Sequence, residues 1–252
     1  MRESKVLNEF EYESFKLFSN LFQPLTKNQY LIKVNLFKEF LNGKELVEVD
    51  KYDCEKFIEY ISSIYTKSTC EKIFSYLHSY YNFLIKENII YDNPFKKVRK
   101  PKVSKLAKRS SILTIDEIDL IIENISKEKI RDQALIVFLI TTGCMVNELI
   151  RVKWRDISFF KNDYYITLSK NGKSRMIKMH SLCTYLLNEY RGSKAIEDND
   201  ELIFTSAKTN SITDRNVRFI VRKILDKSGL TNNSSKDFRH SFAAISLRLG
   251  AN

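Results

Sequence analysis

The sequence predicts a mainly α-helical protein in which two helical domains are accompanied by one small antiparallel β-sheet. Apolar residues recur at three- and four-residue steps along most of the chain, which is typical of amphipathic helices. Only 6 glycines and 3 prolines interrupt 252 residues, and this favours long helices with short turns. The pair Asn171-Gly172 separates two strand-like runs, 164–169 and 175–179, and is a strong hairpin signal.

The charge balance points to a polyanionic partner. Lysine and arginine number 42 against 31 acidic residues, giving a net charge of +11 and a pI near 9.3. Nucleic acid fits such a balance first and an acidic membrane surface second. No apolar run approaches the ~18 residues that span a bilayer, and the N-terminus carries no signal-peptide core. We therefore expect a cytoplasmic protein.

The four cysteines stand singly, without the spacing of a metal site or of a disulfide framework. They are interpreted as reduced, packed thiols of an intracellular protein. No metal and no cofactor are expected. These cysteines are Cys54, Cys70, Cys144 and Cys183.

The first part of the chain reads as helices. Residues 1–25 predict one amphipathic helix that ends near Pro24, and its apolar side could pack on its own domain or on a neighbouring subunit. Residues 26–95 predict a helical domain. Its helices are expected to begin at capping residues, namely Thr26, Asp53, and Ser68 or Thr69.

Basic residues suggest two phosphate-contacting stretches, although both could simply be solvated. The first lies where the long helix begins. The second is the linker 96–111; from Pro94 to Ser111 the chain has many bases and no acid, and should be extended. The candidate DNA contacts in these stretches are Lys67, Ser68, Thr69, Lys72, Lys97, Arg99, Lys100 and Lys102.

Residues 112–252 predict a second domain. A buried helix over 131–142 is broken by Gly143, and further helices are expected at about 181–190 and 214–228. Trp154 is expected to anchor the core. The last helix should begin at Ser234 or Ser235 and end at Gly250. Its expected apolar face comprises Phe238, Phe242, Ile245 and Leu249, and the helix before it offers Arg215 and Arg218 as DNA contacts.

Three stretches carry a family resemblance. In order they are Thr141–Trp154, with its Thr-Gly and Glu-Leu pairs; Leu168–Met179, with Lys170 in a hairpin; and Ser235–Asn252, with Arg239-His240 in the first turns of a helix. Together they resemble the catalytic domain of the tyrosine recombinase (phage integrase) family. Residues 26–95 resemble, more softly, the core-binding (SAM-like) domain of the same proteins. The family cleaves and rejoins DNA through a covalent 3′-phosphotyrosine.

The resemblance implies a role for each matched residue. Arg239 matches the second arginine, which binds the scissile phosphate, and Lys170 matches the lysine that protonates the leaving oxygen. Glu148 matches an orienting acid. Lys236 falls where the family has a histidine. His240 follows Arg239 as in the family, while Lys173 and Arg175 are expected to contact the DNA backbone.

The chain departs from the family at a central position. Met145 stands where the family has its first arginine, and a thioether offers phosphate neither a charge nor a donor. Removing one such donor costs about 10²–10³ in rate in other enzymes. In the family a later segment brings a third basic residue and then the tyrosine, and neither follows here. The chain is therefore expected to be C-terminally incomplete and inactive in strand cleavage.

Double-stranded DNA is the expected partner, with a possible homo-oligomer on DNA and with no membrane and no small-molecule substrate. Three hypotheses stay open. The chain could belong to a recombinase lineage, bacterial or phage-encoded, that still binds DNA. It could be a non-enzymatic DNA-binding regulator or accessory subunit that kept the fold. It could also be an unrelated basic helical protein that meets RNA or a membrane surface.

Overall fold

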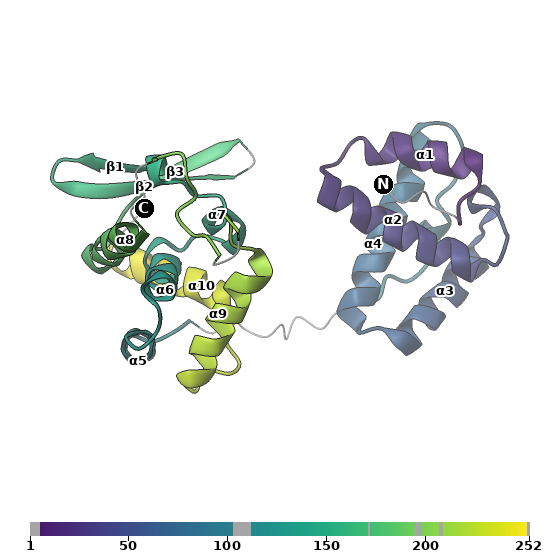
Figure 1. The fold of residues 1–252 in the computed structure, drawn as a ribbon. Coiled ribbons are helices and arrows are strands. Elements are labelled where there is room, and N and C mark those ends of the chain that lie inside the picture. Colours follow the sequence, from purple (N-terminus) through teal and green to yellow (C-terminus); the bar gives the residue numbers. More distant parts are fainter. Residues whose placement is uncertain (1–5, 103–111, 171, 195–197, 207–208, 251–252) are drawn as a thin grey trace. The chain divides into compact units, whose positions relative to one another are not determined.

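The computed structural model describes residues 6–102, 112–170, 172–194, 198–206 and 209–250. The chain divides into two compact units, Met1–Ala107 and Lys108–Asn252 (Figure 1). Each unit has its own hydrophobic core. Helices predominate in both units, and a three-stranded antiparallel sheet belongs to the second. The predicted fold class is confirmed.

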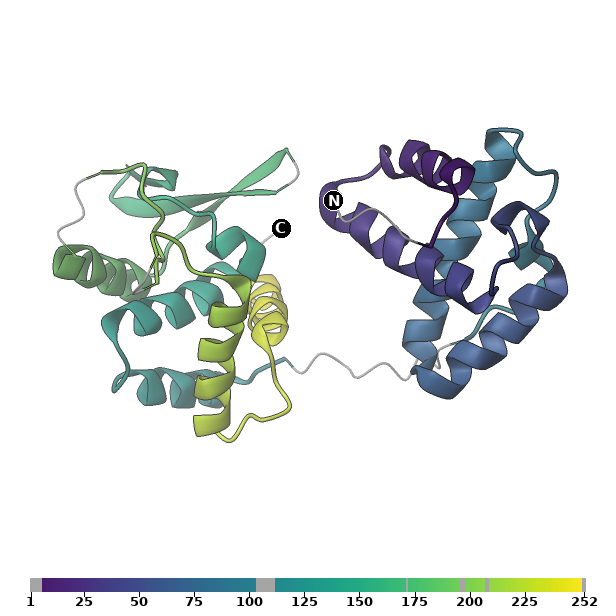
Figure 2. The same cartoon turned by 45° about the vertical axis from the view of Figure 1, so that its right-hand side comes forward.

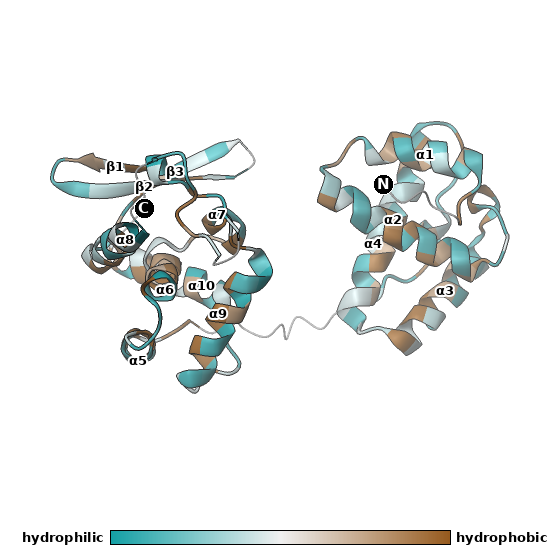
Figure 3. Ribbon diagram, viewed as in Figure 1, coloured by the Kyte–Doolittle hydropathy of each residue, from teal (hydrophilic) through white to brown (hydrophobic). Residues whose placement is uncertain are grey.

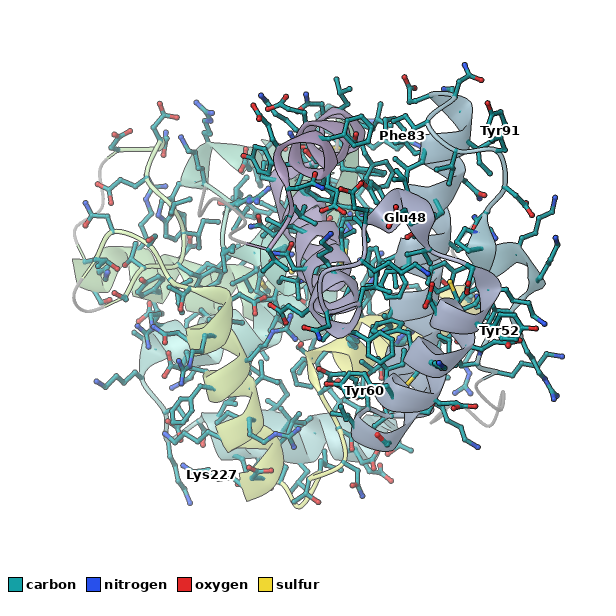
Figure 4. The ribbon with its side chains drawn as sticks, turned by 90° about the vertical axis from the view of Figure 1, so that its right-hand side faces the viewer. Glu48, Tyr52, Tyr60, Phe83, Tyr91 and Lys227 are labelled. Atoms are coloured by element: carbon teal, nitrogen blue, oxygen red, sulfur yellow. The ribbon has the colours of Figure 1, made fainter. Side chains whose placement is uncertain are left out.

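The first unit is a helical bundle with an aromatic core. Its elements are α1 (Glu9–Ser19), α2 (Pro24–Phe40), η1 (Leu46–Glu48), α3 (Lys51–Ile64), α4 (Lys67–Lys86) and η2 (Pro94–Lys97). Phe18 of α1 packs edge-on against Tyr30 of α2, with ring centroids 4.7 Å apart, and against Tyr80 of α4 at 5.3 Å. The first helix therefore packs on its own domain, which the sequence left undecided. Tyr52, Tyr60 and Tyr91 stay at the surface of this unit (Figure 4).

Helix starts in this unit differ by a few residues from the sequence prediction. Pro24 was expected to end the first helix, but it begins α2, where a missing N–H costs nothing. Asp53 was expected to cap α3; Asp50 is the cap, and it accepts from the Asp53 N–H at 3.0 Å. Likewise α4 is capped by Thr66, through the Thr69 N–H at 3.4 Å, rather than by Ser68 or Thr69. The capping preference is right, but the cap lies one turn earlier.

The beginning of the basic connector is folded, contrary to the expectation of an extended chain from Pro94. Residues 94–97 form the 3₁₀ helix η2, because Asn93 accepts a hydrogen bond from the Phe95 N–H at 2.9 Å. Phe95 is fully buried, with its ring 5.4 Å from that of Phe37 and 5.5 Å from that of Phe74. The apolar gain from burying this ring outweighs the repulsion among its basic neighbours. Residues 103–111 of the predicted linker lie outside the described residues.

The second unit places helices on one side of a small sheet (Figures 1 and 2). Its buried centre is α6, whose residues Ala134 to Leu139 are all inaccessible to solvent. α8 and α10 pack on α6. The elements in order are α5 (Ile115–Ile125), α6 (Ile130–Thr142), α7 (Val146–Leu149), η3 (Trp154–Asp156), β1 (Ile157–Phe160), β2 (Asp163–Lys170), β3 (Lys173–Lys178), α8 (Ser181–Lys194), α9 (Asp214–Lys227) and α10 (Ser235–Arg248).

The sheet is an antiparallel meander in the order β1-β2-β3. The predicted β2–β3 hairpin pairs Lys170 with Lys173 across its turn, and β1 adds an outer strand that pairs Ile157 with Ile166. Ile166 and Leu168 of β2 are buried, so one face of the sheet closes the hydrophobic core. This face fixes the register, and therefore the direction in which the hairpin end projects.

The last helix begins as predicted but buries less than predicted. Ser234 is the N-cap of α10, and the Asp237 carboxylate accepts from its N–H at 2.7 Å and from its hydroxyl at 3.1 Å. Phe238 is fully buried, whereas Leu249 is 83% exposed. The expected apolar face is thus buried only in the first half of α10, because no described residue covers the last turn of the helix.

Candidate phosphate-binding site

A tight turn after α6 brings two distant parts of the chain into contact. Gly143 ends α6 in the left-handed conformation, with φ +57°. A Cβ on this residue would lie 2.3 Å from Cδ1 of Phe242 in α10. Glycine is therefore required here both for backbone conformation and for the close approach of α10. This packing sets the first turns of α10 beside residues 143–148.

Arg239 of α10 is held on that turn. Its Nη1 donates to the Gly143 carbonyl oxygen at 2.7 Å and lies 3.9 Å from Oε2 of Glu148. Both contacts use the same nitrogen, and 43% of the side chain is exposed. The guanidinium is thus held through Nη1, while its other N–H groups can donate to an anion such as phosphate.

Glu148 is the buried hub of the site. Its two oxygens accept from Nη1 and Nη2 of Arg175 at 2.5 and 3.0 Å, and Oε2 also accepts from the Met145 N–H at 2.7 Å. Burial alone raises the pKa of this carboxyl, but the Arg175 guanidinium, the Met145 N–H and the nearby Arg239 outweigh it and lower the pKa. The same pairing raises the pKa of Arg175. Glu148 therefore stays ionised and orients its neighbours.

The hairpin delivers Lys170 to the same place. Lys170 is the last residue of β2, and its ammonium nitrogen lies 3.3 Å from the sulfur of Met145. Met145 in turn is joined through its N–H to Glu148, which neighbours Arg239. Contacts therefore run without a break from the hairpin to α10. The two predicted cations Lys170 and Arg239, 69 positions apart in sequence, therefore belong to one surface patch. The patch consists of Lys170, Met145, Glu148 and Arg239.

Other predicted site residues of this unit are neighbours of Lys170 and Arg239 on the hairpin and on α10. Lys236 and His240 flank Arg239 on α10, and Lys173 faces Lys170 across the hairpin turn. Arg175 was expected on DNA, but its guanidinium is engaged by Glu148, a partner that sequence reasoning did not assign to it. The patch combines several cations, while its carboxylate is already matched by Arg175. Its chemistry is that of an anion-binding surface.

α9 carries a second basic surface. Arg215 and Arg218, which were predicted as DNA contacts, are exposed on it, and Arg218 donates to Asp214 of the same helix at 2.5 and 3.0 Å. Arg222, which was not predicted as a DNA contact, continues the same helical face. Its arginine-every-turn spacing was the signal that could have identified it. These residues line a hollow of about 390 Å³ together with Phe219, Ser234 and Ser235.

The predicted contacts in the first unit form a further basic surface. Lys67, Ser68 and Lys72 are exposed at the start of α4, whereas Thr69 is half-buried with its hydroxyl 3.1 Å from that of Thr66. Lys67 lines a hollow of about 370 Å³ whose other basic residues are Arg99, Lys100 and Lys102.

Two lysines of this surface are already paired within the unit. Lys97 lies 3.3 Å from the Asp92 carboxylate, and Lys100 lies 3.2 Å from that of Glu71. Exposed pairs of this kind are weak, so both lysines can exchange their partner for a phosphate.

Within the described ranges, no group of three or more histidine, cysteine or acidic residues is placed to hold a metal ion. No helix in the same ranges is both long and apolar enough to cross a membrane.

Comparison with known proteins identifies the class of fold. A solved structure of the site-specific recombinase XerH bound to a palindromic difH substrate superposes with a TM-score of 0.76, at 22% identity, over 90% of this chain and 70% of that one. A lambda integrase dimer bound to a COC′ core site gives 0.74 at 16% identity, over 95% and 90%. At these identities the likeness establishes the fold alone, which this chain shares with XerH and lambda integrase.

Sequence comparison gives the family. Residues 111–252 match the phage integrase family, and residues 20–88 match the phage integrase N-terminal SAM-like domain. Tyrosine recombinase XerC of Roseiflexus castenholzii is 25% identical over 236 residues, covering 88% of this chain and 74% of the relative. XerC of Staphylococcus aureus is 26% identical over 241 residues, covering 91% and 79%. The chain belongs to the phage integrase family.

Proposed function

We propose that this chain binds double-stranded DNA in site-specific recombination or integration, and that Lys170 and Arg239 hold one backbone phosphate. The observation that carries the proposal is their position at the two ends of one contact series, through Met145 and Glu148. Two cations on one patch, in a chain of net charge +11, suit a polyanion.

The comparisons support this assignment. The relatives are tyrosine recombinases, and the XerH and lambda integrase structures contain DNA. The lambda integrase structures include a dimer on a core site and a tetramer on a Holliday junction. We extend this to the present chain as assembly into a homo-oligomer on its DNA, in the cytoplasm.

We further propose that the chain binds DNA without cleaving it, as a regulator or accessory subunit would. The observation that favours this second function is the contact of the Met145 thioether with Lys170. Met145 is the residue that the sequence resemblance matches to the family's first arginine. A phosphoryl transition state gains its stabilisation from fixed positive donors, and this position supplies none.

Electrophoretic mobility shifts against salt test DNA binding. A duplex selected from a random-sequence library should bind with a steep salt dependence. Changing Lys170 and Arg239 together to Ala should weaken binding and lower the log–log slope by about 0.9, because one phosphate is lost. Lys127→Ala, an exposed lysine away from the patch, is the matched control. An unchanged slope in the double variant would overturn the site.

A covalent trapping assay tests the absence of cleavage. The selected duplex, nicked near its centre, is incubated with the chain and analysed under denaturing conditions. No protein–DNA adduct is expected. A stable adduct that includes this chain would show that Met145 is compatible with strand cleavage and would contradict the second proposal.

A further inference from the structure

A hollow of about 430 Å³ lies at the β1–β2 end of the sheet, next to α8. None of the phosphate-site residues lines it. One wall comes from the sheet, with Ile157, Phe159 and Tyr164, and the other from α8, with Leu187, Asn188 and Arg191. The hollow is therefore a separate feature of the second unit.

The apolar wall is the continuation of the core-facing side of the sheet. Tyr164 alternates with the buried Ile166 and Leu168 along β2, and Phe159 pairs with Tyr164 across the strands. Their ring centroids are 4.8 Å apart. Yet Phe159 is 62% and Tyr164 38% exposed, and the apolar character of β1 is visible in Figure 3. On the core-facing side of the sheet, Phe159 and Tyr164 are therefore not covered by any described residue.

The polar part of the hollow is positively charged. Arg155 and Arg191 line it, and no acidic residue does so among the described residues. Arg155 is 58% exposed and pairs at the rim with Asp200 at 2.5 Å, while Arg191 donates to Asn199 at 2.7 Å and lies over the Trp154 ring. The guanidinium fork of Arg155 retains further donors for a second carboxylate.

Trp154 also lines the hollow, with Arg191 over its ring. Its indole N–H is buried and has no acceptor among the described residues. A buried donor without a partner costs free energy.

We propose that this hollow docks a short acidic segment of a partner protein that carries aromatic or aliphatic side chains. The apolar side chains of the segment cover Phe159 and Tyr164, and its carboxylates meet Arg155 and Arg191. The combination of an aromatic wall with arginines is typical of the anchoring positions of protein interfaces.

Fluorescence anisotropy with a labelled peptide that alternates aspartate and phenylalanine tests the proposal. The full chain should bind it. Peptides with lysine for aspartate, or serine for phenylalanine, should bind at least about tenfold more weakly. Phe159→Ser and Arg155→Glu should each weaken the aspartate–phenylalanine peptide by a similar factor. Both positions are exposed, so the fold should persist, and thermal unfolding of each variant checks this.

Matched variants separate docking from general attraction to a basic protein. Phe219→Ser removes another exposed phenylalanine, on α9, and Lys127→Glu reverses an exposed charge on the same unit. Both should leave peptide affinity unchanged, as should changing Lys170 and Arg239 to Ala. Equal losses in the test and control variants, or preferential binding of a single-stranded oligonucleotide to the hollow, would overturn the proposal without affecting the proposed DNA binding.

Discussion

The ammonium group of Lys170 lies 3.3 Å from the thioether sulfur of Met145. The hairpin lysine therefore contacts a neutral side chain that cannot balance its positive charge. The contact is a weak one, since thioether sulfur is a poor acceptor. Lys170 is therefore free to leave Met145 for a stronger acceptor such as a phosphate oxygen.

Met145→Arg should strengthen DNA binding. The new guanidinium would add a donor between Lys170 and Arg239, and one additional phosphate contact steepens the log–log salt slope by about 0.9. Mobility-shift titrations over a range of salt measure both quantities. Met145→Leu keeps the size and lack of charge and should match the parent chain. Identical slopes for the arginine and leucine variants would contradict a phosphate position here.

Glu148→Gln should destabilise the second unit. It removes the charge opposite Arg175 and leaves that guanidinium partly desolvated without its partner, at a cost of ~1–3 kcal/mol, limited because Arg175 is about a third exposed. Urea unfolding measures the change. Glu123→Gln, an exposed carboxyl on α5, should cost less than about 0.5 kcal/mol. Equal losses would mean that the pair contributes little.

The Glu148–Arg175 pair should also make the free energy of unfolding depend on pH in the acid range. Because the folded state lowers the pKa of this carboxyl below its ordinary value of 4.5, the pair contributes fully above about pH 4.5. The contribution is lost as the pH falls through the lowered, folded pKa, when Glu148 gains a proton. Unfolding free energies measured from neutral to acid pH should converge for the parent and Glu148→Gln at the acid end. Parallel curves would contradict the linkage.

Gly143→Ala should be more damaging than the same change at Gly229. Both glycines have positive φ, +57° and +72°, so each substitution strains the backbone by about 1 kcal/mol. Only at Gly143 does the new Cβ also collide with Phe242, whereas the space at Gly229 is open. Overpacking adds typically 1–3 kcal/mol. Thermal or urea unfolding of both variants measures the difference.

A double-mutant cycle isolates that collision. In Phe242→Ala, which removes the two closest ring atoms, the further change Gly143→Ala should cost little more than the backbone strain. The expected coupling is about 1 kcal/mol or more. Additive effects would show that Phe242 does not hold α10 against the turn.

Phe95→Ala should destabilise the first unit by about 3–5 kcal/mol, the usual cost of removing a buried phenylalanine. The ring fills a space between Phe37, Phe74 and Tyr81 and holds the beginning of the basic connector on the core. Urea unfolding measures the loss, and Tyr91→Ala, fully exposed nearby, is the control. A loss as small as that of Tyr91→Ala would contradict the anchoring role.

Local interactions explain what could be predicted. Helical periodicity located α6 and α9, the Asn171-Gly172 pair located the hairpin, and Ser234 located the start of α10. These signals act between residues a few positions apart, where backbone geometry and side-chain spacing decide the outcome. The observed caps of α3 and α4 lie about one turn before the predicted ones. Several polar residues at each helix start compete for the same N–H groups, and sequence alone does not decide among them.

By itself the sequence determined the helical class, the basic character, and the residue types at the candidate site, including methionine at position 145. Tertiary structure alone decided that Arg175 pairs with Glu148, that Lys170 reaches Met145, and that Phe95 ties the connector to the first core. Those contacts join residues far apart in sequence, and side-chain type says nothing of which distant partner will be near. Only packing, such as that of Gly143 against Phe242, fixes that distance.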